Sequence, residues 1–237
     1  RLQPFWYSSW GERSFLVVVA VLIGAFAAVA DACLHAWVAQ LAEMAARVQA
    51  LPRSWHQYAW WGALLVLPLI GLTLSYCVQR YMGGPRYAKS LSPLILALNR
   101  KRTGIPVSEV FSHMISSALS VGFGGSAGLE APSVLTGAAI GSNTASFFRI
   151  DRRRRGLLLG CGGAAAISAI FDSPVAGVLF AAEVLLPEFR VSALVPMMMS
   201  SAVAAVVSRM ILGSNQFFLA ITDPWRTNAI PCYVILG

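Results

Sequence analysis

Long apolar stretches separated by short polar or glycine-rich breaks run through most of this chain. The first, over 15–46, is longer than the roughly 20 residues that cross a bilayer as a helix, so it predicts a tilted or extended span. Further spans are predicted over 62–78 and 191–212. Shorter apolar segments predict helices packed among these spans, at 107–121, 134–148, 157–170 and 175–186.

Two breaks fall where the apolar pattern would otherwise continue. Five of the eleven residues in 122–132 are Gly or Pro, and the run KSLSP at 89–93 precedes a segment, 94–98, too short to cross. Broken backbone at membrane depth is tolerated only where protein buries it or it lines a cavity. Short helices that begin near the midplane are a usual way to hold an anion, and ordinary loops are the alternative.

Composition places the chain in a membrane. Hydrophobic residues make up 57% and charged residues 12%, against about 25% charged in soluble domains. The net charge of +8 comes largely from arginines between apolar segments, notably at 100–102 and 152–155. This pattern predicts cytoplasmic loops rather than nucleic-acid binding. The aromatic segment 1–13 predicts an interfacial lead-in.

Glu130 is an isolated carboxylate within the second break. No Lys or Arg lies within eighteen residues of it, so a local ion pair is not expected. Pro132 suits the first turn of a new helix, and the positive end of that helix would attract both the carboxylate and an anion. Protonation would neutralise the carboxylate and end its competition with the anion, so Glu130 would act as a gate. The alternative is that Glu130 is a structural acid.

Other polar residues carry weaker hypotheses. Asp31 and His35 are four residues apart and therefore lie on one face of a helix. They form either a proton relay or a structural pair near a helix end, and the structural pair is the favoured interpretation. Glu183 is equally consistent with a proton relay and a structural acid. Asp172 is expected to cap the helix entered through Pro174.

The cysteines and histidines show no metal-ligand spacing, so no metal or cofactor is expected. The four cysteines are expected to be free, buried thiols; they are Cys33, Cys77, Cys161 and Cys232.

Two runs resemble the CLC family of chloride channels and chloride/proton antiporters. GLEAPSV at 128–134, followed by GAAIG at 137–141, is similar to the family's G-(R/K)-E-G-P signature and the helix after it. GAAAISAIFDSPVAGVLF at 163–180 is similar to a second family motif, which ends with two acids. The resemblance implies an all-α integral membrane fold with tilted, broken and re-entrant helices, in which 14–237 forms the first inverted repeat of a two-repeat domain. It also implies a homodimer with one pore per subunit.

The resemblance also implies roles for individual residues. Glu130 matches the external gating glutamate, and Ser90 takes the place of a serine that coordinates the central anion. Glu183 is the candidate for an inner proton path. The anion-binding set is Ser90, Gly128, Leu129, Glu130 and Ala131.

Four departures from the family pattern bear on mechanism. Leu129 replaces a basic residue beside the gate, Ala131 replaces a Gly, and Lys89 replaces another Gly. Val184 stands where antiporters commonly carry a second, internal proton-transfer glutamate, which favours a channel.

The leading hypothesis is therefore chloride transport through a pore gated by Glu130, in a multi-pass protein of a bacterial inner membrane. Chloride/proton or fluoride/proton antiport is the alternative within the family. An intramembrane enzyme is disfavoured because HExxH and paired-aspartate motifs are missing from this sequence. A non-conducting structural paralogue is a third hypothesis.

Overall fold

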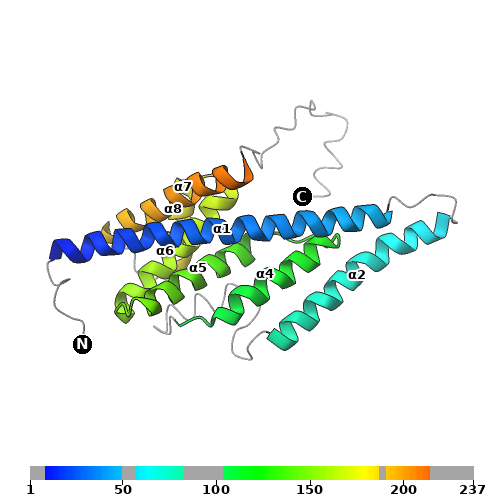
Figure 1. The fold of residues 1–237 in the computed structure, drawn as a ribbon, viewed down its shortest axis with the longest axis horizontal. Helices are drawn as coiled ribbons and strands as arrows, with labels where there is room; N and C mark the ends of the chain where they lie inside the picture. Colours follow the sequence, from blue (N-terminus) through cyan, green and yellow to red (C-terminus); the bar gives the residue numbers. More distant parts are fainter. Residues whose placement is uncertain (1–8, 50–56, 83–103, 187–190, 214–237) are drawn as a thin grey trace.

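A computed structural model describes residues 9–49, 57–82, 104–186 and 191–213. Predictions on Ser90, Lys89, Cys232 and the short segment 94–98 fall outside these ranges. Every regular element within them is helical (Figure 1). The helices are α1 (Ser9–Gln49), α2 (Gln57–Met82), α4 (Val107–Gly122), α5 (Glu130–Phe147), α6 (Arg152–Phe171), α7 (Pro174–Phe180), the π-helical η1 (Ala181–Leu185) and α8 (Val191–Leu212).

Several helices extend beyond the apolar segments that predicted them. The lead-in predicted over 1–13 ends earlier, because α1 begins at Ser9. The arginine run 152–155, predicted to be a loop, instead forms the first turn of α6. The backbone N–H groups of Arg154 and Arg155 both donate to the Asp151 carbonyl, each at 3.0 Å. Arginine is a good helix former, so hydropathy alone misplaces this boundary.

The single helix predicted over 175–186 is two elements. A regular helix, α7, ends at Phe180, and the next five residues form η1. The Leu186 N–H donates to the Ala181 carbonyl at 2.9 Å, which is the wide i to i+5 spacing of a π-helix. Such wide turns are rare and are often found at functional sites.

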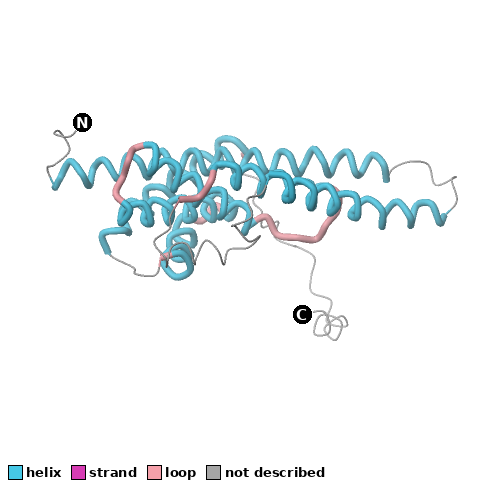
Figure 2. Tube along the Cα trace, turned by 90° about the horizontal axis from the view of Figure 1, so that it is seen from below, coloured by secondary structure: helices cyan, strands magenta, loops and turns pink. Residues whose placement is uncertain are grey.

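Helices α4 and α5 lie beside each other and run in opposite directions, joined by the irregular segment 123–129 (Figure 1). Figure 2 draws the described loops between the helices in pink. The reversal agrees with the turn predicted at the glycine-rich break. Helix α1 passes across the whole bundle and packs against α4, α5, α6 and α8.

Small residues bring α5 and α6 into close backbone contact. A Cβ on Gly137 would collide with the Gly162 carbonyl, and a Cβ on Gly162 would collide with the Gly137 carbonyl. One turn further along α5, a Cβ on Gly141 would collide with the Leu158 carbonyl. Small residues allow helices to approach this closely in lipid, where burial of apolar surface gives no driving force for helix association.

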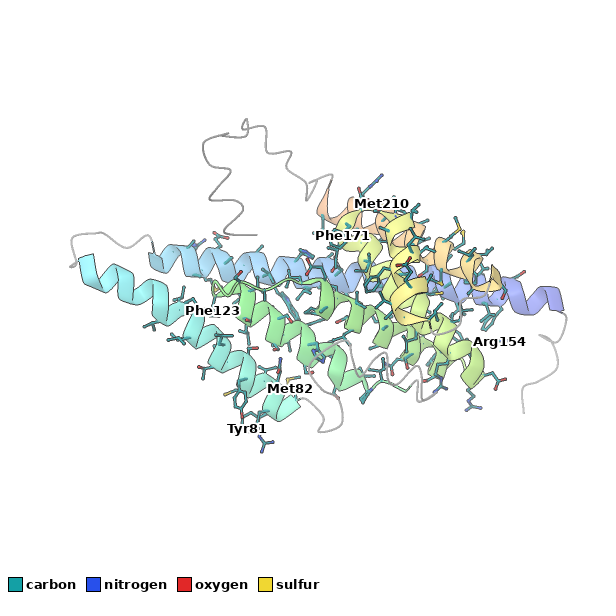
Figure 3. All side chains as sticks on the ribbon, turned by 180° about the vertical axis from the view of Figure 1, so that it is seen from behind. Tyr81, Met82, Phe123, Arg154, Phe171 and Met210 are labelled. Carbon is teal, nitrogen blue, oxygen red and sulfur yellow. The ribbon has the colours of Figure 1, made fainter. Side chains whose placement is uncertain are left out.

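The outer surface is strongly apolar. Two helices are long and apolar enough to cross a membrane, over Ser14–Arg47 and Ser192–Leu212. Exposed apolar side chains line α2 and α8, including Leu69, Met198 and Met210. Figure 3 shows Phe171 and Met210 close together at one end of α6 and α8, with Arg154 at the opposite end of α6. A surface of this kind suits lipid or a protein partner rather than water.

Candidate functional site at the break between α4 and α5

The break begins directly after α4, where the regular helical pattern of backbone hydrogen bonds ends. The Gly124 N–H donates to the Val121 carbonyl at 2.9 Å, and the Gly125 N–H donates to the Ser120 carbonyl at 2.9 Å. Gly124 has a φ of 93°, a conformation that favours glycine. From there to Leu129 the chain has no regular structure before α5 begins.

Glu130 is the first residue of α5. The sequence placed it beside the helix start, and the structure places it in the first turn, with Pro132 two residues later as predicted. Leu129 occupies the N-cap position and makes no side-chain capping bond. The helix start therefore offers backbone N–H groups that no capping side chain satisfies, which is the setting of an anion site.

The Glu130 side chain is exposed and folds back toward the chain that precedes it. A Cβ added to Gly128 would collide with the Glu130 carboxylate, so glycine at 128 leaves the space that the carboxylate occupies. Among the residues that the structure describes, this carboxylate has no hydrogen-bond or ion-pair partner. The arrangement therefore fits a carboxylate that can move.

Behind this exposed acid lies a buried one. Ser133, in the same first turn, donates its hydroxyl to Asp31 Oδ1 at 2.6 Å. His35 Nδ1 lies 3.0 Å from the Asp31 carbonyl oxygen and 3.4 Å from Oδ2. The predicted Asp31–His35 pairing is confirmed, but its predicted place near a helix end is wrong, because Asp31 lies mid-way along α1. Sequence reasoning missed Ser133, whose partner is a hundred residues away.

Glu183 and Val184 both lie in η1 with exposed side chains. Among the described residues, Glu183 has no hydrogen-bond or ion-pair partner. The two acid-bearing elements approach the same part of α6: a Cβ on Gly163 would collide with the Leu185 side chain, and Val134 Cγ1 would lie at 3.7 Å from that Cβ. No contact joins Glu183 to Glu130 within the described residues.

Asp172 does not cap α7, contrary to the sequence prediction. It ends α6 with a left-handed backbone, φ 51° and ψ 34°. The Asp172 carboxylate accepts two bonds from Arg209 Nε on α8, at 2.6 and 2.7 Å. The N-cap of α7 is Ser173, which makes no side-chain capping bond. Sequence spacing could not reveal the competing arginine, because it comes from another helix.

The cysteine prediction is partly wrong. Cys33, Cys77 and Cys161 are free, as expected. Cys161 is buried, but Cys77 is half-buried and Cys33 is exposed on α1. The described residues contain no group of three or more His, Cys, Asp or Glu side chains placed to hold a metal ion.

Comparison with known proteins identifies the family. The sequence model described as "Voltage gated chloride channel" matches residues 70–237. The chain belongs to this family. Its members are integral membrane proteins, in agreement with the apolar surface and the two span-length helices.

Three relatives illustrate the likeness. The putative chloride channel protein ClcB-like of Ralstonia nicotianae is 27% identical over 84% of this chain and 47% of its own length. The H(+)/Cl(-) exchange transporter ClcA of Vibrio vulnificus is 31% identical over 50% of this chain and 26% of its own length. A crystal structure of a CLC-type fluoride/proton antiporter superposes with a TM-score of 0.72 at 26% identity, covering 97% of this chain and 54% of that chain.

These likenesses support the predicted all-α CLC-type fold. The chain spans about half the length of the first of these relatives and of the solved antiporter. Both channel and exchange-transporter names occur among its relatives.

Proposed function

We propose that this chain contributes to a membrane pathway for chloride or another small anion, and that Glu130 is its gate. The observation that carries the proposal is the exposed Glu130 carboxylate at the uncapped start of α5, directly after an irregular break. Within the described part of the chain it has no hydrogen-bond or ion-pair partner. Gly128, Leu129 and Ala131 flank this helix start and complete the described part of the proposed anion site. Ser90 is proposed as its other ligand.

The gate follows from competition for one helix start. The backbone N–H groups there attract either the Glu130 carboxylate or a permeating anion. When Glu130 is deprotonated it occupies the position, and when it is protonated it gives the position up. Backbone donors suit this task because they bind an anion without a permanent positive charge that would trap it.

The test is anion efflux from liposomes that contain the intact protein, with and without Glu130→Gln. Glutamine resembles the protonated gate, so chloride should still move and any coupled proton movement should be abolished. Glu43→Gln is the control, because Glu43 is an exposed acid of α1 that pairs with Arg47. Chloride efflux should also be faster in Glu130→Gln than in the parent, and unchanged efflux would contradict the gate.

We further propose that the pathway is channel-like. Val184, beside Glu183 in η1, supports this, because a valine cannot relay a proton. A chloride gradient should then drive no proton movement through the intact protein. Proton uptake that follows the gradient and is lost in Glu183→Gln would instead identify an antiporter with Glu183 on its inner proton path. Running the assay with fluoride in place of chloride addresses selectivity.

The remaining proposals concern the assembly. We propose a homodimer in a bacterial inner membrane, and cross-linking in native membranes tests it. A non-conducting paralogue remains the competing proposal, supported by Leu129 and Ala131 at the helix start. Absence of anion efflux from both the parent and Glu130→Gln proteins would favour that proposal.

A further inference from the structure

A buried acid lies directly behind the exposed one. Asp31 is 3% exposed at the centre of the span-length helix α1. Its Oδ1 accepts the bond from Ser133, and its Oδ2 lies beside His35 at 3.4 Å. Asp31 Oδ2 makes no hydrogen bond among the described residues. A carboxylate at this depth is expensive and is a functional-site hypothesis by default.

Three other buried contacts between helices in this bundle are made without an acid. Ser168, Ser200 and Ser208 each donate to a backbone carbonyl oxygen on a facing helix, at 2.7, 3.1 and 3.0 Å. Each of these bonds holds two helices together at the cost of burying a hydroxyl only. Joining α1 to α5 would need no more than this, so adhesion between helices does not explain Asp31.

What distinguishes the Asp31 bond is the turn that it holds. The Ser133 backbone N–H donates to the Leu129 carbonyl at 3.1 Å and so closes the first turn of α5. That turn begins with Glu130. Asp31 therefore fixes, through one side chain, the backbone that carries the exposed carboxylate. Its negative charge is also placed favourably at the positive end of the helix.

We infer that Asp31, acting through Ser133, is a positioning residue for Glu130. The bond anchors the first turn of α5 to α1, so that Glu130 and the neighbouring N–H groups keep a fixed relation. This inference rests on the proposed role of Glu130 as a gate. It divides the work between two acids: Asp31 is buried and holds the helix start, while Glu130 is exposed and moves.

The experiment measures how much gating depends on Ser133. The gate factor is defined as chloride efflux with Gln at 130 divided by efflux with Glu at 130, in liposomes containing the intact protein. It is measured in the parent and in Ser133→Ala, Ser133→Thr and Ser208→Ala backgrounds. Ser208→Ala is the matched control, because it removes a buried hydroxyl bond between α6 and α8.

The parent gate factor should exceed one, and Ser133→Ala should lower it about tenfold toward one, in keeping with the loss of a hydrogen bond to a charged group. Ser133→Thr retains the hydroxyl and should retain the gate factor, as should Ser208→Ala. If Ser133→Ala does not assemble, Ser133→Cys, with a similar volume and a weak S–H donor, should lower the gate factor in the same direction.

Two outcomes would overturn the inference, and they differ. If Ser133→Ala changes efflux by the same factor with Glu and with Gln at 130, the bond only supports the fold and does not position the gate. If the parent gate factor is one, Glu130 is no gate, and the proposed function fails together with the inference.

Discussion

At the scale of single residues, the site depends on which side chains are missing as much as on those present. Gly128 has no side chain, and the Glu130 carboxylate occupies the space where a Cβ would lie. Leu129 cannot cap α5 because it has no polar side-chain atom. Both features leave the helix start uncapped and leave room for the Glu130 carboxylate.

Gly128→Ala should therefore displace the Glu130 carboxylate. The cost of forcing an unfavourable rotamer is about 1 kcal/mol, so chloride efflux should rise about fivefold toward that of a protein without the gate. In a Glu130→Ala background the same substitution should add nothing, because no carboxylate remains to be displaced. The measurement is chloride efflux from liposomes.

Gly104→Ala is the control for Gly128→Ala, since a Cβ at Gly104 meets nothing within 4 Å. It should leave efflux unchanged. Equal efflux in Gly128→Ala and the parent protein would show that the position of the Glu130 carboxylate does not depend on the absence of a Cβ at residue 128.

At the scale of elements, α6 is the support against which the site is built. The first turns of α5 and the π-helical η1 both approach the stretch of α6 around Gly163. Helix α5 comes close because Gly137 and Gly162 oppose each other, backbone against backbone. The position of Glu130 thus depends on small residues elsewhere in its own helix.

Gly162→Ala should destabilise this contact. Its Cβ would meet the Gly137 carbonyl, which belongs to the backbone and cannot rotate away. Overpacking of this kind typically costs about 1–3 kcal/mol, so the melting temperature of the purified protein in detergent should fall.

Gly160→Ala is the matched control on the same helix. Its Cβ would lie 3.2 Å from a Leu186 methyl group, which is the end of a flexible side chain. The loss of thermal stability should therefore be clearly smaller than for Gly162→Ala. Equal losses would show that the close backbone contact does not limit stability.

At the scale of the whole molecule, the bundle is apolar outside as well as inside. In α6 every residue from Leu158 to Ile170 is buried, and this stretch is made largely of glycine, alanine and serine. Larger apolar side chains, such as Met198 and Met210 on α8, are on the outside instead. This inversion is expected when the surroundings are lipid or another apolar surface.

A charge on this outer surface should be tolerated according to its depth. Met198→Arg places a charge well inside the span Ser192–Leu212, where insertion scales assign a penalty of about 2.5–3.5 kcal/mol. The amount of protein in isolated membranes should fall. Met210→Arg lies near the end of the helix, where a long side chain can reach the interface, so it should have little effect. Similar yields of both variants would argue against burial of α8 in the membrane.

The sequence by itself determined the class of fold and the location of the candidate gate. Apolar length indicates membrane helices because a bilayer sets a minimum span. The glycine-rich break and Pro132 indicate a helix start near Glu130, because both residue types act on the local backbone. The motif around Glu130 also carried the resemblance to the family. These are signals that neighbouring residues contain.

Only the tertiary structure decided which distant groups meet. Ser133 binds Asp31 a hundred residues away, and Asp172 is drawn to Arg209 rather than to the helix that follows it. The wide turn of η1 also follows no local pattern in the sequence. A hydrogen bond or ion pair between helices depends on how the helices pack, and that packing is fixed by small residues such as Gly137 and Gly162 acting together across the bundle.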